Sequence, residues 1–234
     1  EPVVMDTRFN SSVTDIFRNE YLSPRSPYTT LQIPKQGIGE WCHPLHTVDI
    51  NDAGLRSSVQ NGILNTELGI PFRTPAEGHN VAFTSLWDNY PDSLEIPLKG
   101  KASRAYLLMA GSTNHMQCHI DNGVIRVYYK DGTCDVMFLR NPDNWPPIEH
   151  IFFEDGLAFN RHTPALYRLR LKTGEISNNF GEELGFPGAS RELDGGAAVL
   201  LEMPLNPGKK LSHLVLETLS NDAVIGLMSI TLQR

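Results

Sequence analysis

The chain has 234 residues, with 20 Lys and Arg against 27 Asp and Glu, and therefore a net charge of −7. A chain of this length can bury a core without disulfide or metal support, as one large domain or two small ones. The acidic balance excludes a protein that follows nucleic-acid phosphates, because no basic run exceeds Lys209-Lys210. No apolar stretch approaches the roughly 20 residues that span a bilayer, so no membrane insertion is expected.

The first 45 residues differ in composition from the rest of the chain. They are rich in Ser, Thr, Pro and Asn, and Ser23-Pro24 and Ser26-Pro27 favour extended backbone. The chain begins without an initiator Met or an apolar leader, as a processed product or a piece of a larger protein would. Residues 1–45 are therefore expected to be an irregular N-terminal arm or linker that packs on a domain formed by residues 46–234.

The rest of the chain predicts many short strands. Its 16 Pro and 19 Gly separate short apolar runs, which is typical of strands and turns. Strands are expected at Asn80–Ser85, Leu94–Leu98, Arg104–Met109, Ala165–Lys172, Ala197–Glu202, His213–Thr218 and Ala223–Leu232. One sheet alone would leave an apolar face in water, so we expect an all-β fold with two antiparallel sheets packed as a β-sandwich or jelly roll.

The region from His115 to Leu139 gives the clearest local prediction. Asp121-Asn122-Gly123 and Asp131-Gly132 separate the three apolar runs MQCHI, VIRVYYK and TCDVMFL. Asn-Gly and Asp-Gly accept the positive φ of tight hairpin turns, so a three-stranded antiparallel meander is expected here. Its middle strand would separate Cys118 from Cys134, so we expect no disulfide between them.

Three loops between the expected strands each carry a tryptophan, namely Trp41, Trp87 and Trp145. An indole flanked by Asp, Asn and Glu suits a sugar, because its apolar face covers a pyranose while the polar neighbours bind hydroxyl groups. The alternative is that each indole closes one end of the sandwich.

The sugar-binding interpretation predicts a shallow site at one end of the sandwich. Trp145 would be the stacking platform, with Trp87 or Tyr90 as a second wall. The expected ligand-binding residues are Trp145, Asn144, Glu149, Trp87, Asp88, Tyr90 and Asn114.

Catalysis would need a pair of groups. Two carboxylates could flank a glycosidic bond, and Glu149 with Asp88 or Asp155 is the candidate pair. The sequence has no G-x-S-x-G, H-E-x-x-H, P-loop or dinucleotide motif. No catalytic residue is therefore assigned, and the domain is not expected to be an enzyme by itself.

Candidate metal ligands lack a compact spacing. Cys42, His43 and His46 lie close together in sequence, and His115 with His119 could add ligands, but no C-x-x-C pattern fixes a zinc site. We therefore expect no metal ligand and no cofactor.

A structural calcium ion is a less favoured alternative to the absence of any cofactor. Oxygens of Asp49, Asn51 and Asp52 could bind calcium, although such residues also form ordinary Asx turns. The three cysteines, at positions 42, 118 and 134, are too few and of the wrong number for a disulfide framework.

Two sets of segments carry a family resemblance. Leu68–Arg73, Ser93–Ala102, Tyr106–Met109 and Leu214–Arg234 resemble the opening and closing strands of the galactose-binding-like jelly roll of carbohydrate-active proteins. YLLMAGSTN at Tyr106–Asn114, the strand GVIRVYYKDGT and the loop Asn141–Glu149 more closely resemble the C-terminal module of large uncharacterised bacterial glycan-utilisation proteins. The similarity runs from about residue 8 to the end of the chain.

The resemblance implies a secreted or periplasmic protein with a glycoside hydrolase-like catalytic domain upstream. The function expected first is a non-catalytic carbohydrate-binding or accessory module of a multidomain glycan-degrading protein, with a glycan or oligosaccharide as ligand. One alternative is a structural module that buttresses the upstream catalytic domain. The other is a glycoside hydrolase or lyase in its own right.

Overall fold

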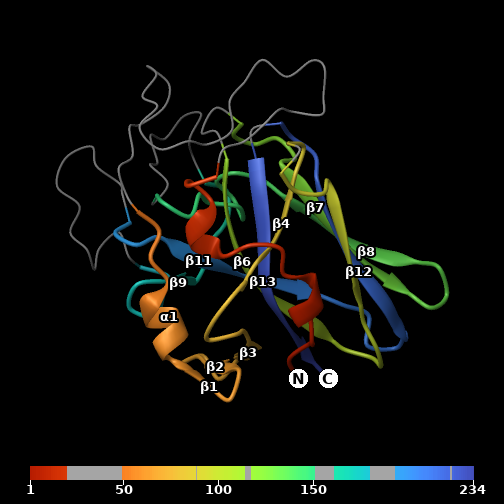
Figure 1. Ribbon diagram of the computed structural model, residues 1–234. Coiled ribbons are helices and arrows are strands. Elements are labelled where there is room, and N and C mark those ends of the chain that lie inside the picture. Colours follow the sequence, from red (N-terminus) through yellow and green to blue (C-terminus); the bar gives the residue numbers. More distant parts are fainter. Residues whose placement is uncertain (20–48, 88, 114–116, 151–160, 180–192, 222) are drawn as a thin grey trace.

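A computed structural model describes residues 1–19, 49–87, 89–113, 117–150, 161–179, 193–221 and 223–234. Two antiparallel sheets pack face to face, which confirms the predicted all-β sandwich (Figure 1). The six-stranded sheet has the order β10 (Ile176–Ser177), β9 (Arg168–Arg170), β11 (Ala197–Pro204), β6 (Arg104–Thr113), β13 (Ala223–Gln233), β4 (Ala82–Ser85). The four-stranded sheet has the order β5 (Ser93–Pro97), β12 (Leu211–Thr218), β7 (Gly123–Tyr129), β8 (Cys134–Leu139).

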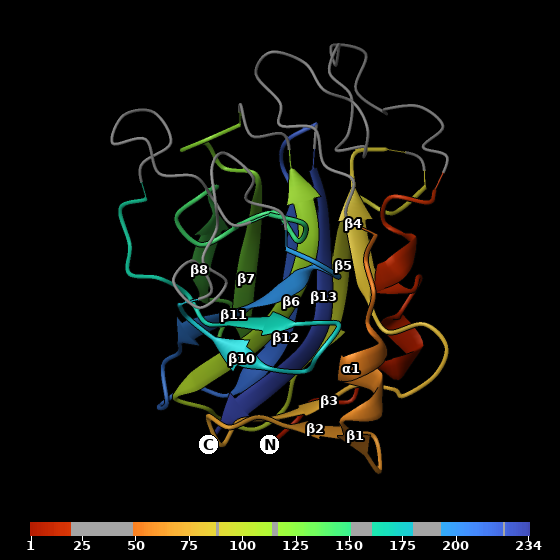
Figure 2. The same ribbon diagram turned by 90° about the vertical axis from the view of Figure 1, so that its left-hand side faces the viewer.

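Smaller elements cover the outer face of the six-stranded sheet, and the sequence did not predict them. They are the helix α1 (Ala53–Ser57) and a three-stranded sheet of β1 (Val59–Gln60), β2 (Ile63–Asn65) and β3 (Pro71–Arg73). Two single 3-10 turns, η1 (Asp6–Arg8) and η2 (Val13–Asp15), lie in the N-terminal segment. Figure 2 shows α1 and β1–β3 together at one end of the sandwich.

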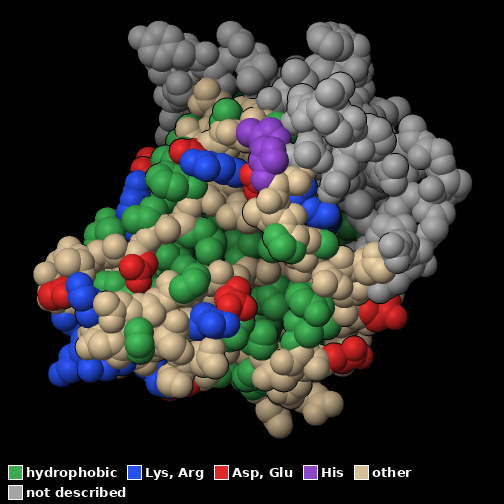
Figure 3. Space-filling model, turned by 180° about the vertical axis from the view of Figure 1, so that it is seen from behind, with side chains coloured by type: hydrophobic (Ala, Val, Ile, Leu, Met, Phe, Trp, Pro, Cys, Tyr) green, Lys and Arg blue, Asp and Glu red, His purple; other side chains and the backbone are tan. Residues whose placement is uncertain are grey.

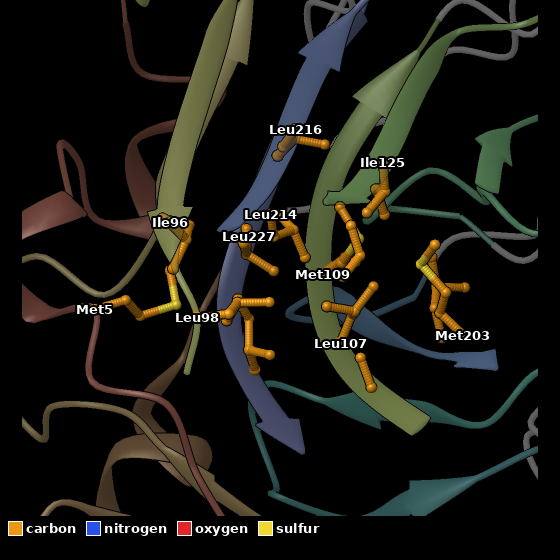
Figure 4. Close-up of a cluster of buried hydrophobic side chains, with 14 of the residues drawn as sticks. Met5, Ile96, Leu98, Leu107, Met109, Ile125, Met203, Leu214, Leu216 and Leu227 are labelled. Carbon is orange, nitrogen blue, oxygen red and sulfur yellow. The ribbon is translucent and has the colours of Figure 1, made fainter. Parts of the chain in front are cut away.

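The central strands of the six-stranded sheet are buried on both faces. In β6, Leu107 and Met109 point into the core between the two sheets, as Figure 4 shows. Leu108 and Ala110 point to the opposite face, into a second apolar cluster with residues of α1, β2 and β3. Because successive side chains alternate between faces, a strand buried on both sides reads as a continuous apolar run.

The described part of the N-terminal arm packs along the sandwich. The backbone NH of Val3 donates to the Ile230 carbonyl at 2.8 Å. The Asn10 amide bonds both backbone groups of Phe83, at 2.9 and 2.8 Å. Met5 and Ile16 are buried, each in one of the two apolar clusters. Residues 20–48 of the arm lie outside the described residues.

The predicted meander is correct for two of its three strands. β7 and β8 pair as a hairpin, and Gly132 in its turn has a φ of 84°. The first predicted strand is wrong, because Cys118 makes only an isolated bridge with Asn141. The other neighbour of β7 is β12, from far along the chain. Cys118 and Cys134 are thiols and form no disulfide.

The helices are short throughout the described residues. The longest, α1, has five residues. Within this part of the chain, no helix has the length and apolar character needed to cross a bilayer.

Candidate functional site

Trp145 is a core residue and cannot be the predicted stacking platform. Its side chain is 0% exposed and belongs to the apolar cluster between the two sheets. The ring lies against β6 at Gly111, where an added Cβ would come within 2.7 Å of the indole. A sugar needs an exposed ring face, so the predicted role of Trp145 is wrong and the alternative of an indole that plugs the sandwich applies to it.

Trp87 and Tyr90 are also buried, with exposed fractions of 9% and 7%. The Trp87 indole NH donates to the Asn221 carbonyl at 2.8 Å. The Tyr90 ring packs against Phe83 with centroids 5.1 Å apart, and its hydroxyl bonds Ser11 and Asn19. The hydroxyl contacts of Tyr90 join the N-terminal arm to the sandwich, and the Trp87 contact lies within the sandwich. Because both rings are buried, neither is available as a wall of the predicted site.

The remaining predicted residues do not form one surface site. Asp88 and Asn114, like Trp41, lie outside the described residues. Asn144 lies at a partly exposed position, where its Oδ1 accepts from the Arg140 backbone NH and its Nδ2 donates to the Phe138 carbonyl, both at 2.8 Å. Glu149, the last of the predicted hydroxyl partners, is buried.

Glu149 belongs to a buried polar network. Both of its carboxylate oxygens contact the Ser112 hydroxyl, at 2.8 and 2.9 Å. Burial raises the pKa of the Glu149 carboxyl to about 7, although a backbone hydrogen bond, the Ser112 hydroxyl and the charge of Arg168 act in the opposite direction. A carboxyl whose ionised form is disfavoured by burial keeps its proton to a higher pH than an exposed one.

Arg168 occupies the same interior and holds three backbone carbonyls. Its guanidinium donates to the carbonyls of His150 and Pro147 at 2.7 Å and to that of Ala197 at 3.0 Å. Burial lowers the pKa of Arg168 to about 10, against the raising effect of Glu149. Arg168 therefore fastens the segment that follows Trp145 to strands β9 and β11.

The hydrolase alternative has no completed carboxylate pair among the described residues. Its proposed partners for Glu149, Asp88 and Asp155, both lie outside them. The oxygens of Glu149 are occupied by Ser112 inside the sandwich. The described geometry of Glu149 is that of a structural group.

A groove of about 400 Å³ is lined by residues of β6, β8 and β11, by the segments that precede β3 and β9, and by the loop after β8. Its lining residues are Leu68, Ile70, Tyr106, Met137, Asn144, Ala165, Leu166, Tyr167, Leu200, Leu201 and Glu202. Figure 3 shows hydrophobic side chains gathered on this face. The groove thus combines an apolar floor with the two phenol rings of Tyr106 and Tyr167.

Polar groups stand at the rim of this groove. Glu202 forms an ion pair with Arg104 on the neighbouring strand, and the Tyr106 hydroxyl donates to Gln233 Oε1 at 3.4 Å. Among the described residues of the predicted site, Asn144 alone lines the groove. A signal for Tyr106 was present in the sequence, because it alternates with Ala105 and Leu107 in a predicted strand and therefore faces away from the core between the sheets.

A second group of polar side chains includes Asp143, which directly precedes the groove residue Asn144 in the sequence. His119 and His162 stack with ring centroids 4.5 Å apart. The Nδ1 atoms of His119 and His162 lie 3.7 and 3.6 Å from Oδ2 of Asp143. One potential ligand atom from each of the three residues falls within 4.8 Å of the others. Of the predicted metal candidates, only His119 takes part; Cys42, His43, His46 and His115 lie outside the described residues.

The residues suggested for calcium have protein partners. Asp49 pairs with Arg18, and Asp52 pairs with Arg56 and accepts from the Asn80 amide. Asn51 Oδ1 accepts from the Ala53 backbone NH at 3.0 Å. The last contact is an Asx turn at the start of α1, the alternative that the sequence left open.

Comparison with family models, with curated proteins and with solved structures gives no match to this chain. The resemblance to a galactose-binding-like module of glycan-utilisation proteins therefore stays a prediction.

Proposed function

We propose that this chain is a non-catalytic carbohydrate-binding or accessory module of a multidomain secreted or periplasmic glycan-degrading protein. In this proposal the sandwich is a jelly roll of the galactose-binding-like type, and an oligosaccharide binds in the groove. The observation that supports it is the groove of about 400 Å³ with Tyr106 and Tyr167 in its lining and Asn144 and Glu202 at its rim. That size and that mixture of aromatic, apolar and polar groups suit a small organic ligand.

In this proposal the rings of Tyr106 and Tyr167 provide the aromatic surface that the sequence had predicted for Trp145 and Trp87. Tyr167 is 39% exposed, so its ring is accessible to a sugar, unlike the buried indole of Trp145. The Asn144 amide is held in one orientation by its two backbone contacts and keeps one further N–H and one lone pair for a hydroxyl group. A fixed polar group beside an aromatic surface gives orientation as well as affinity.

The experiment is a glycan array or affinity electrophoresis with the chain alone, with released sugars measured in the same incubations. We expect retention without products and a Kd between about 1 μM and 1 mM. Tyr167→Ala should weaken binding by about 1 to 3 kcal/mol, because the ring loses its buried contact with the sugar. Phe138→Ala is the matched control, since Phe138 is 41% exposed and does not line the groove.

Equal affinity in Tyr167→Ala and the wild type would reject the groove as the binding site. Released sugars would instead support the hydrolase alternative. Loss of those products in Glu149→Gln would assign them to the buried carboxyl.

A structural module is the second candidate, and one observation favours it. Strand β8 is at the edge of the four-stranded sheet, and Cys134, Val136 and Phe138 project from one side of it into solvent. An open strand edge with apolar side chains suits contact with a neighbouring domain. The double variant Val136→Ser and Phe138→Ser should then lower the melting temperature of the longer polypeptide and leave glycan retention unchanged.

A further inference from the structure

Three side chains with metal-binding atoms meet at the surface beside the loop that carries Trp145. His119 follows Cys118 before β7, Asp143 belongs to the loop after β8, and His162 precedes β9. Figure 3 shows histidine side chains gathered on the same face as the groove. Segments distant in the sequence thus bring two imidazoles and a carboxylate to one point.

The His119 ring has unused polar atoms. Both of its nitrogens are shielded from solvent, and neither has a hydrogen-bond partner among the described residues. Its Nδ1 is 3.7 Å from Asp143 Oδ2, which is too long for a hydrogen bond. A buried nitrogen without a partner is costly, so such an atom points to a ligand that occupies its lone pair.

The backbone around His119 holds the ring in this place. His119 has a φ of 55°, in the left-handed region that side chains other than glycine rarely adopt. Its backbone NH donates to the Asn141 carbonyl at 2.7 Å. This contact ties the histidine to the start of the loop that contains Asp143.

Asp143 is oriented so that one oxygen faces both histidines. Its Oδ1 accepts from the His162 backbone NH at 2.7 Å, and its backbone carbonyl accepts from the Thr163 hydroxyl at 2.6 Å. Oδ2 is directed toward the two imidazoles, at 3.6 and 3.7 Å. Hydrogen bonds that fix the orientation of a carboxylate in this way are the usual support of a metal ligand.

We propose that His119, Asp143 and His162 bind a divalent transition-metal ion, and that zinc is the ion this site takes. Two ligand atoms each about 2.0 to 2.1 Å from a tetrahedral zinc ion lie about 3.3 Å apart. Two of the three ligand-atom separations, those to Asp143 Oδ2 at 3.6 and 3.7 Å, need only a small contraction to reach that value. The third, between the ligand atoms of the two imidazoles, is within 4.8 Å, so a rotation of the exposed His162 ring would complete the geometry. Two nitrogens and one oxygen suit zinc, whereas magnesium and calcium prefer oxygen ligands alone.

The proposed site has an open side. Three protein ligands leave one position of a tetrahedral ion for water or for an oxygen of a bound molecule. His162 is 64% exposed at its side chain, so this position is accessible from solvent. Asp143 is followed directly by Asn144, which lines the groove, so the metal would stand next to the proposed ligand surface.

The test is a zinc titration of the full chain after removal of metal with a chelator. Competition with a chromophoric zinc indicator gives the stoichiometry and Kd for the wild type, His162→Ala, Asp143→Asn and His79→Ala. His162 is exposed, so its replacement leaves the core intact. His79 is also exposed and lies between β3 and β4, outside the proposed site, which makes it the matched control.

We expect zinc binding by the wild type and by His79→Ala, with one ion lost or weakened at least about tenfold in both His162→Ala and Asp143→Asn. The visible spectrum of added Co²⁺ should show tetrahedral coordination in the wild type and lose it in the same two variants. The proposal is overturned if the wild type binds no zinc. It is also overturned if His162→Ala and Asp143→Asn retain wild-type zinc binding, which would locate the ion elsewhere, or if His79→Ala loses as much as they do.

Discussion

Asp143 and Glu149 are two carboxylates of one loop, and their surroundings differ completely. Glu149 lies inside the sandwich with both oxygens against the Ser112 hydroxyl and with Arg168 nearby. Asp143 lies near the surface with one oxygen held by a backbone NH and the other facing two histidines beyond hydrogen-bond distance. The first carboxylate is satisfied by the protein and stabilises the loop, whereas the second has capacity left for a ligand.

Residue type and position in a loop therefore do not by themselves identify a functional carboxylate. Both residues stand in the same Pro-rich stretch, and the sequence favoured Glu149. What distinguishes them is the number of oxygens that already have partners. Stability and zinc affinity in variants of this loop can test this distinction.

Trp145→Ala, in the loop between the two carboxylates, should have the largest effect on stability. The indole is fully buried in the apolar cluster between the two sheets, so its loss leaves a large cavity in the core. We expect the free energy of unfolding to fall by about 3 to 5 kcal/mol. Urea unfolding measures this change, with the exposed Phe138→Ala as control. Equal losses in the two variants would contradict the core position of Trp145.

Glu149 should make stability depend on pH. The ordinary pKa of its carboxyl is 4.5 and the folded value is about 7, so between these values the folded state holds a proton that the unfolded chain has released. The free energy of unfolding therefore falls as pH rises through this window. The contribution is fully present below pH 4.5 and is lost above about pH 7, on the order of 3 kcal/mol in total.

Glu149→Gln isolates this effect. Arg168 keeps its charge throughout the window, because its pKa is lowered only to about 10. Urea unfolding at pH 5 and pH 8 should show that the glutamine variant gains stability relative to the wild type as pH rises. Parallel pH profiles for the two proteins would be incompatible with a buried, protonated Glu149.

Zinc bound at the Asp143 end of the loop should raise the free energy of unfolding. At a free zinc concentration of about 100 times Kd, a ligand specific for the folded state raises the free energy of unfolding by about 2.7 kcal/mol. Thermal or urea unfolding with and without zinc measures this gain. It should disappear in His162→Ala and persist in Glu149→Gln. Loss of the gain in Glu149→Gln alone would reverse the roles assigned to the two carboxylates.

Thr163→Val should have the smallest effect. The Thr163 hydroxyl donates to the Asp143 carbonyl, and valine keeps the shape of threonine without this hydrogen bond. We expect a loss of about 0.5 to 1 kcal/mol in unfolding free energy and a decrease in zinc affinity of up to about tenfold. The pH dependence due to Glu149 should not change. A change there would mean that the two ends of the loop are coupled.

The strands of the sandwich were predictable because their apolar residues and turns are local signals. Ser93–Pro97 and Ala223–Gln233 lie within a residue or two of the strands expected there. Turn residues also gave the β7–β8 hairpin correctly. They could not give the other neighbour of β7, because β12 joins it across a long stretch of chain and no turn links the two.

The site was less predictable, since it depends on contacts between distant segments. Polar neighbours suggested an exposed Trp145, but Gly111 leaves room for the indole on β6. Gly111 lies two residues beyond the strand predicted at Arg104–Met109, whereas the observed strand β6 continues to Thr113 and includes it. A glycine in a strand marks such a close approach, so the predicted strand ended too early for this signal to be used. His119 stood out as a possible ligand, whereas Asp143 and His162 reach it only through the packing of three loops.

Strand β13 is an interior strand of the six-stranded sheet, although it is formed by the C-terminal residues Ala223–Gln233. This strand lies between β6 and β4, and Ile230 pairs with Leu107 across more than half of the sequence. Contacts at such separation form slowly, because closing the long intervening loop costs entropy before any pairing is gained. During synthesis the apolar strand β6 must therefore wait for Ala223–Gln233, and until then this edge is open to pairing with other chains.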